Sequence, residues 1–194
     1  MAATNGGRRR VVVTGMGAIS PLGLTVEENW EAIVAGRSGV ERITHFDAQG
    51  RGFGTQIAAE VKGFDPLKRI GPKEARRMDR VIQFAVVAAL DAVADARLEI
   101  TDDNAERVGV IIGSGIGGIA TLEQQATVMA EKGPKRISPF LIPMMIADMP
   151  AGQVSISLGA KGTNFCPVSA CATSAHAIGE AAEIIRRGAA DVIV

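Results

Sequence analysis

The feature that most constrains this sequence is a series of short apolar runs separated by stretches with helical periodicity. The runs are Val11–Val13, Val108–Ile112, Asn164–Ser169 and Asp191–Val194. Runs of this length that are bounded by glycines or turns are typical of buried strands. Because strands that alternate with helices pair side by side through crossover connections, the sequence predicts an α/β fold with a largely parallel sheet.

Five stretches predict the intervening helices. They cover residues 25–36, 76–96, 121–130, 147–158 and 171–187. Thr25 can cap the first helix, with Glu28 three residues later completing a capping box. The last helix is small and apolar on almost every side, so we expect it to be buried. The sequence ends within an apparent strand, which predicts that it is part of a longer protein.

Composition excludes several classes of protein. The 21 Lys+Arg balance 21 Asp+Glu, which does not suit a protein that coats nucleic acid. No run reaches the roughly 18 apolar residues of a membrane span. The two cysteines, Cys166 and Cys171, lie too close and too alone for a secreted disulfide framework or a zinc site. We therefore expect a cytoplasmic protein that binds no metal, cofactor, nucleic acid or membrane.

Cys171 is the residue with the clearest chemical potential, because it lies between a predicted strand and a predicted helix. A thiol at a helix N-terminus experiences the positive end of the macrodipole, which favours the thiolate, and a backbone N–H there can face a carbonyl under attack. That arrangement suits acyl transfer. The alternative is an inert buried cysteine. His176 lies about 140° further round the helix, so we do not expect it to be the base for Cys171.

A glycine-rich loop follows the second predicted strand. Gly113, Gly115 and Gly118 match the spacing of a dinucleotide-binding loop. Neither this cluster nor the glycines near the N-terminus carries the Lys-Ser/Thr pair of a phosphate-binding loop. We prefer the interpretation that the glycines permit close packing beneath a site, and nucleotide binding is the alternative.

Two basic groups and one apolar segment could contact a partner. The basic residues are Lys73, Arg76, Arg77 and Arg80, and then Lys132, Lys135 and Arg136. Local positive patches attract acidic partners, although an ordinary solvated surface is the other interpretation. The segment Pro139–Pro150 is rich in Phe, Leu, Ile and Met but is interrupted by proline. It predicts an adaptable apolar wall that lines a pocket or a subunit interface.

Several segments together resemble the β-ketoacyl-[acyl-carrier-protein] synthases, and among them the type II condensing enzymes. The similarity rests on Ser169-Ala170-Cys171-Ala172-Thr173-Ser174-Ala175-His176, Val13–Gly17, Ser20–Gly23, Gly113–Gly118 and Ile137–Phe140. It extends from about Arg10 to Val194, and the combination is specific although no single motif is.

The resemblance implies a thiolase-like layered α/β fold with a mixed five-stranded sheet and a buried central helix. Residues 1–9 would form a flexible tail and residues 10–194 the N-terminal half, while the C-terminal half would be absent. It also implies a homodimer formed through the strand near residues 163–167.

The resemblance further implies a decarboxylative Claisen condensation in fatty-acid biosynthesis, with no cofactor. Cys171 would accept an acyl group from acyl carrier protein, and malonyl-carrier protein would lose CO₂ to form the carbanion that attacks the thioester. In the family, two histidines and a lysine of the C-terminal half assist decarboxylation. We therefore expect this chain alone to be inactive.

Other positions receive a role only through the resemblance. Ile116, Leu141 and Ile142 match residues that line the acyl pocket, and the last two reach toward the pocket of the dimer partner. The residues that match the basic docking surface for acyl carrier protein are Lys73, Arg76, Arg77, Lys135 and Arg136. A polyketide ketosynthase and a non-catalytic half that only dimerises are the alternative functions.

Overall fold

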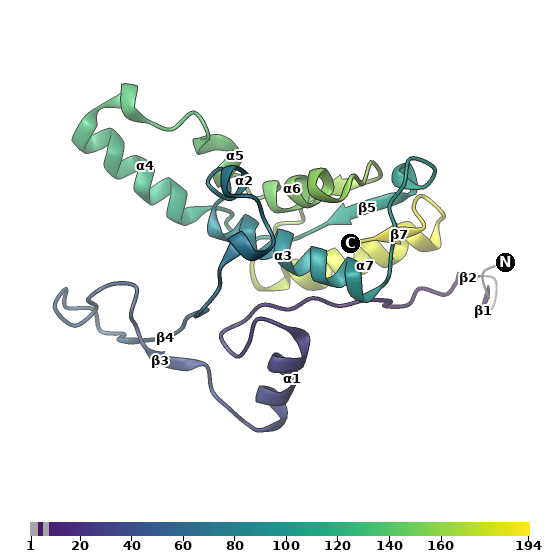
Figure 1. Cartoon of the computed structure of the whole chain (residues 1–194), viewed down its shortest axis with the longest axis horizontal. Coiled ribbons are helices and arrows are strands. Elements are labelled where there is room, and N and C mark those ends of the chain that lie inside the picture. Colours follow the sequence, from purple (N-terminus) through teal and green to yellow (C-terminus); the bar gives the residue numbers. More distant parts are fainter. Residues whose placement is uncertain (1–3, 6–7) are drawn as a thin grey trace.

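The computed structural model describes residues 4–5 and 8–194, and its central element is a parallel sheet in the order β6-β5-β7 (Figure 1). The strands are β5 (Val108–Ile111), β6 (Asn164–Phe165) and β7 (Val192–Ile193). Val110 of the central strand pairs with Asn164, and Val108 pairs with Val192. Strands distant in sequence thus meet through helical crossovers, which confirms the predicted α/β class.

Helices cover both faces of the sheet. Successive residues of β5 point to opposite faces, so each face presents apolar side chains that a helix can cover. On one face, α3 (Arg80–Asp95) and α6 (Met149–Leu158) pack with Val110 into the larger apolar cluster. On the other face, α7 (Thr173–Arg186) packs against Ile111. The sheet is therefore the middle of three layers, and α7 is supported from one side.

The remaining elements surround these layers. The helices are α1 (Val26–Val34), α2 (Pro72–Ala75), α4 (Ile119–Lys132) and α5 (Leu141–Met145). Short 3-10 turns are η1 (Pro66–Lys68), η2 (Ala105–Arg107), η3 (Pro134–Arg136) and η4 (Ala170–Ala172). Within the described ranges, no helix has both the length and the apolar character to cross a membrane.

Two further strand pairs are antiparallel, and each forms a sheet of its own. They are β1 (Thr4–Asn5) with β2 (Arg8–Arg9), and β3 (Val40–Arg42) with β4 (Ile57–Ala59). The expected flexible tail at residues 1–9 lies partly outside the described residues, and its described part is the β1–β2 pair.

All five predicted helices are present, as α1, α3, α4, α6 and α7. The largest error is at the start of α3, which begins at Arg80 because Asp79 caps it by accepting a hydrogen bond of 3.1 Å from the Val81 N–H. Thr25 caps α1 by accepting from the Glu28 N–H at 3.1 Å. Short-range capping chemistry therefore sets these helix ends.

The expected mixed five-stranded sheet is wrong, because the β6-β5-β7 sheet has three strands and all are parallel. Val11–Val13 is not a strand, and it runs beside α7 and β7 along a cavity of about 520 Å³. The adjoining chain is held by α3 instead, since the Met16 N–H donates to the Asp95 carboxylate at 2.9 Å. A Cβ at Gly17 would lie 2.0 Å from a backbone oxygen of α3, so this crossing excludes side chains.

The expected burial of the helix after Cys171 is also wrong. Of the α7 side chains, only Thr173, Ala177 and Ile184 are buried, while Ile178 is 72% exposed. The enclosed helix is α3, where Ile82 is completely buried. Small apolar residues suit either environment. α7 has the sheet behind only one face, whereas α3 packs along α6 and belongs to the same apolar cluster as Val108 and Val110 of β5.

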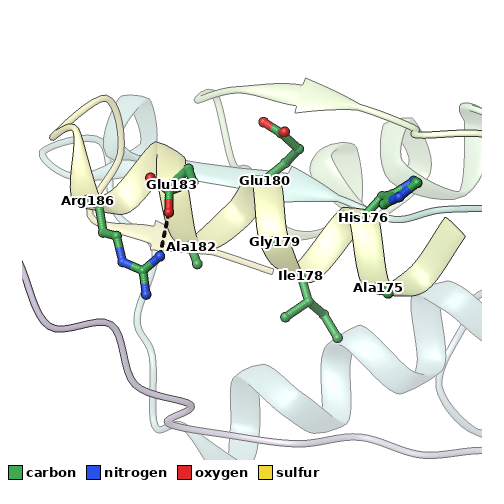
Figure 2. A pocket seen from close by; sticks show the side chains of 8 residues that line it. All are labelled: Ala175, His176, Ile178, Gly179, Glu180, Ala182, Glu183 and Arg186. Carbon is green, nitrogen blue, oxygen red and sulfur yellow. Dashed lines mark hydrogen bonds and ion pairs between the residues drawn. The ribbon is translucent and has the colours of Figure 1, made fainter. Parts of the chain in front are cut away.

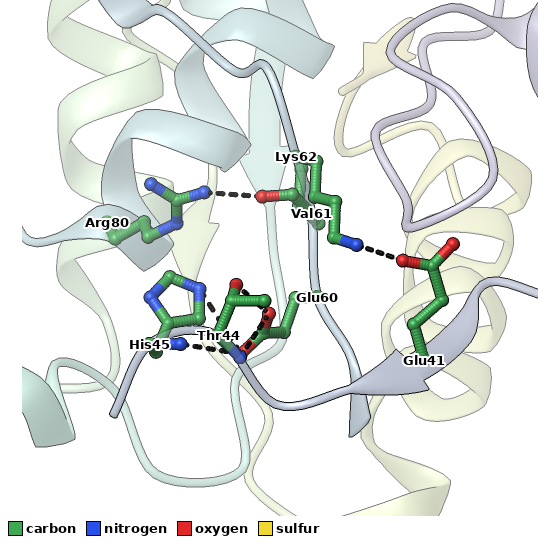
Figure 3. A network of polar contacts seen from close by, with 7 residues as sticks. All are labelled: Glu41, Thr44, His45, Glu60, Val61, Lys62 and Arg80. Atoms are coloured by element: carbon green, nitrogen blue, oxygen red, sulfur yellow. Dashed lines mark hydrogen bonds and ion pairs between the residues drawn. The ribbon is translucent and has the colours of Figure 1, made fainter. Parts of the chain in front are cut away.

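The Glu60 carboxylate forms hydrogen bonds with the start of the long loop that joins β3 to β4 (Figure 3). It accepts hydrogen bonds from the N–H groups of Thr44 and His45, at 3.1 Å each, and from the Thr44 hydroxyl at 2.6 Å. The Thr44 hydroxyl is the main reason that the pKa of Glu60 lies below its ordinary value, and the His45 ring 3.9 Å away adds to this effect.

Glu60→Gln should flatten the acid dependence of stability. Because the folded pKa of Glu60 is lowered, its carboxylate stabilises the fold above the unfolded pKa of about 4.3, and this is lost as pH falls through the folded pKa. We expect the wild type to lose more stability than the variant between about pH 5 and pH 3, measured by thermal denaturation. Glu41→Gln, which removes a surface pair with Lys62, should keep the wild-type pH profile. Equal profiles for Glu60→Gln and wild type would contradict the assignment.

Candidate functional site

Cys171 lies in η4, directly before the first turn of α7, and its side chain is exposed. No side chain caps α7 at Ala172, so the N–H groups that form the positive end of the helix dipole begin one residue after Cys171 without a side-chain acceptor at the cap. The interpretation of Cys171 as an inert buried residue does not fit this exposure. The site therefore presents an accessible sulfur at the start of a helix of almost four turns.

The backbone before Cys171 forms a sharp, strained turn. Ala170 has a φ of 50°, which residues other than glycine rarely adopt. Such strain persists where the surroundings enforce it, and it is common at functional sites. In the part of the chain that the structure describes, no backbone acceptor takes a hydrogen bond from the Cys171 N–H. The turn thus leaves a donor free beside the sulfur.

Ser169 anchors this turn through all of its polar groups. Its N–H donates to Thr173 Oγ1 at 2.9 Å, and its carbonyl accepts from the Ala172 N–H at 3.1 Å. Its hydroxyl lies 2.6 Å from His176 Nδ1. His176 is therefore hydrogen-bonded to Ser169, and the described hydrogen bonds do not join it to Cys171. We did not expect His176 to be the base for Cys171, and its helical spacing does not identify Ser169 as its hydrogen-bond partner.

The glycine-rich loop packs beneath this turn. A Cβ at Gly113 would lie 2.2 Å from Thr173 Cγ2, so the loop touches the first turn of α7 where no side chain fits. At its other end, a Cβ at Gly118 would lie 2.1 Å from the Met144 carbonyl oxygen, and the Gly118 N–H donates to Met145 at 2.8 Å. The loop therefore connects the Cys171 turn with the apolar segment, as the preferred interpretation of these glycines requires.

Asp79 occupies the helix terminus that a bound pyrophosphate would need. Its carboxylate accepts from the Thr121 N–H at 3.0 Å and from the Thr121 hydroxyl at 2.5 Å, in the first turn of α4. Asp79 is 7% exposed, so an anion already satisfies this site from within the protein. This contact disfavours the nucleotide-binding alternative. The sequence analysis missed Asp79, although an Asp before a helical stretch is a common N-cap.

The other cysteine is part of the packing. Cys166 follows β6 and accepts a weak hydrogen bond from the Ser114 N–H, at 3.3 Å. Both cysteines are free. Over the described ranges, no three His, Cys, Asp or Glu side chains are placed to hold a metal ion.

The three residues expected to line an acyl pocket lie on the loop and on α5. Ile116 and Ile142 are exposed, and Leu141 is half-buried. Neither cavity along α7 includes them: one, of about 530 Å³, follows the helix from Ala175 to Arg186 (Figure 2), and the other lies against residues 10–15. The glycine loop that carries Ile116 approaches the Cys171 turn at Gly115, where a Cβ would lie 3.8 Å from Ala170 Cα, whereas Leu141 and Ile142 lie on α5, and neither cavity encloses these residues.

The basic residues expected to dock a carrier protein are all exposed. They are Lys73, Arg76, Arg77, Lys135 and Arg136. The Arg77 guanidinium lies 4.7 Å from the centroid of the Phe140 ring, four residues beyond Arg136. This cation–π contact connects the end of α2 with the segment that follows η3. Arg77 of the first basic group therefore lies beside the segment that follows the second basic group.

The chain matches known proteins over almost its whole length. Residues 8–194 match the family described as "Beta-ketoacyl synthase, N-terminal domain". A curated relative, 3-oxoacyl-[acyl-carrier-protein] synthase 2 of Staphylococcus aureus (strain N315), is 50% identical over 96% of this chain and 44% of its own length. The chain thus spans less than half the length of that relative.

Two solved structures share the fold. The ishigamide ketosynthase/chain length factor gives a TM-score of 0.83 at 35% identity, covering 96% of this chain and 46% of that chain. The AntDE:AntF complex, a type II PKS acyl-carrier protein with its ketosynthase bound to the hexaketide, gives 0.79 at 25% identity, covering 95% and 48%.

Gly113→Ala should destabilise the protein, because the added methyl would overlap Thr173 in a packed layer. We expect a loss of about 2 kcal/mol, measured by denaturant unfolding. Gly115→Ala is the matched control in the same loop, since its Cβ would lie 3.8 Å from the nearest atom and make ordinary contact. The control should change stability by less than about 0.5 kcal/mol. Equal losses for the two variants would show that the close approach at Gly113 does not matter.

Proposed function

The chain belongs to the β-ketoacyl synthase family through that family's N-terminal domain, and from this premise we propose that it supplies the nucleophile of a condensing enzyme that elongates fatty acids. Curated relatives at about 50% identity carry the name 3-oxoacyl-[acyl-carrier-protein] synthase 2. The observation that carries the proposal is the exposed Cys171 thiol at the uncapped start of α7, with a free N–H beside it.

In the first half-reaction, the Cys171 thiolate attacks the thioester carbonyl carbon of an acyl-carrier protein. The carbonyl oxygen becomes an oxyanion, which the Cys171 N–H stabilises by donating a hydrogen bond. The carbonyl re-forms, the bond to the carrier sulfur breaks, and the carrier leaves as its thiolate. The acyl group is then a thioester on Cys171.

In the second half-reaction, malonyl-carrier protein loses CO₂, and the electron pair of the broken bond forms a carbanion. The carbanion attacks the Cys171 thioester and expels the thiolate, so the 3-oxoacyl product is two carbons longer. We assign residues 10–194 to the N-terminal domain of a longer polypeptide, because the chain spans 44% of its relative. The groups that assist decarboxylation belong to the remainder, so these residues alone do not complete the reaction.

In this proposal the acyl chain extends from Cys171 along Ile116, while Leu141 and Ile142 reach toward the acyl pocket of the dimer partner. Support comes from the glycine loop, which touches the Cys171 turn at Gly113 and the apolar segment at Gly118. The same loop therefore contacts both the Cys171 turn and the apolar segment. An acyl chain binds to apolar surfaces of this kind.

Acyl carrier protein docks on the exposed basic residues of the α2 end and η3. Their positive charge complements an acidic carrier, and exposed cations raise the rate of encounter with such a partner. One solved relative is a ketosynthase in complex with an acyl-carrier protein. The contact of Arg77 with Phe140 brings this surface next to the apolar segment.

A homodimer forms through β6, which is an edge strand of the β6-β5-β7 sheet. An edge strand offers unpaired N–H and carbonyl groups to a second copy, and the strand near residues 163–167 is where the family resemblance places the interface. The two free cysteines fit a reducing compartment such as the cytoplasm.

A polyketide ketosynthase is the second candidate, because solved neighbours at 25% and 35% identity include ketosynthases, one of them from a type II PKS. The curated fatty-acid relative is 50% identical, which is why fatty-acid elongation is preferred. Products formed from carrier-bound substrates of graded length would separate the two activities.

Cys171→Ala should abolish acyl loading of the complete natural polypeptide. We expect the loading rate to fall by at least about a thousandfold, because no other group replaces the nucleophile. Intact mass spectrometry after incubation with acyl-carrier protein measures the loading. Cys166→Ala is the control and should load normally. Acyl transfer to Cys166, or loading of Cys171→Ala, would refute the proposed nucleophile, and absence of loading in the wild type would favour a non-catalytic half.

Reversing the charge of Lys135 and Arg136 should weaken docking of acyl carrier protein. We expect the double variant with both changed to Glu to raise the KM for the carrier about tenfold at low salt, with little change in kcat. The difference should shrink as salt screens the charges. Lys161→Glu is the control, because Lys161 pairs with Asp102 elsewhere on the surface. An unchanged KM in the double variant would contradict this docking surface.

A further inference from the structure

We propose that His176 is a positioning residue that holds Ser169 and thereby fixes the strained turn from which Cys171 projects. His176 would act on the acyl-transfer step without touching the acyl group or the sulfur. The inference rests on the proposed function of Cys171 as the nucleophile, and it assigns a task to an exposed histidine that this chemistry does not otherwise use.

Two side chains of α7 form hydrogen bonds with Ser169. Thr173 and His176 are three residues apart on that helix, so they share a face, and both meet Ser169. Thr173 Oγ1 accepts from the Ser169 N–H at 2.9 Å, and His176 Nδ1 lies 2.6 Å from the Ser169 hydroxyl. Thr173 is 4% exposed and is itself locked by the close approach of Gly113. Of the two residues that hold Ser169, His176 is the exposed one, and it is the one that the test replaces.

These two hydrogen bonds matter because the backbone of the next residue, Ala170, is strained. Ala170 stays at a φ of 50° only while its neighbours on both sides are fixed. On one side is Ser169, and on the other is the turn closed by the Ala172 N–H donating to the Ser169 carbonyl at 3.1 Å. Freed from His176, Ser169 can rotate, Ala170 can relax, and Cys171 leaves its place at the start of α7.

His176 is separate from the apolar side of α7. Figure 2 shows its ring projecting from the opposite side of the helix to Ile178. The ring is exposed in this chain, so its removal leaves no cavity among the described residues, and its described side-chain hydrogen bond is to Ser169. This placement allows the positioning role to be tested without unfolding the protein.

The test compares His176→Ala, Ser169→Ala, the double variant and His176→Asn in the complete natural polypeptide. Iodoacetamide alkylates Cys171 and Cys166 in the same sample, and mass spectrometry gives both rate constants. We expect each single variant to lower the Cys171 rate about fivefold, the effect of one lost hydrogen bond, and the double variant to lower it no further. His176→Asn should return to within about twofold of wild type, because Asn Oδ1 replaces Nδ1. In acyl transfer, kcat should fall while KM stays the same.

Cys166 is the internal control for general loosening. A Cys166 rate that rises together with a falling Cys171 rate would overturn the inference, as would a wild-type Cys171 rate in His176→Ala or additive losses in the double variant. The Cys171→Ala test is independent of these results. If Cys171→Ala still loaded acyl groups, the proposed function would fail, whereas the alkylation rates would still report whether His176 positions the thiol.

Discussion

The relation between the central strand and α7 depends on a close approach at Gly113, just after β5, where the glycine meets the Thr173 methyl group with no room for a side chain. Through this contact the most buried strand meets the start of the helix that directly follows Cys171. The same loop reaches Met144 at its other end. One short run of backbone therefore connects the Cys171 turn, the sheet and the apolar segment, which are distant from one another in the sequence.

The five longer helices were predictable from the sequence to within a few residues because their signals are local, whereas the short α2 and α5 were not predicted. Apolar spacing and a cap such as Thr25 lie within one or two turns of each other. The strand expected at Val11–Val13 was wrong because a β-branched run favours extended backbone without choosing a partner. Its neighbours are held by α3, and that choice is made by contacts about eighty residues apart. The predicted burial of α7 was wrong for a related reason: small apolar residues do not indicate which other elements, if any, pack against their helix.

The residues of the candidate site were likewise predictable only where their signals are local in the sequence. Cys171 could be identified because its helix start and its motif are contiguous in the sequence. The contact of Asp79 with Thr121 spans 42 residues, and only the fold brings them together. The contact of Ser169 with His176 is nearer in sequence but depends on an unusual φ at Ala170, which no residue preference indicates. Helix geometry separated His176 from the sulfur, but it could not show where the ring went instead.

Arg77 illustrates how one side chain can belong to two regions. Its charge lies on the exposed basic surface, while its flat guanidinium rests on the Phe140 ring of the apolar segment. Lysine would preserve the charge but would lose the planar stacking, whereas its neighbour Lys73 has no such ring contact among the described aromatic pairs. Evolutionary drift at the two positions should therefore differ: arginine and lysine can interchange at one, and selection for a planar cation constrains the other.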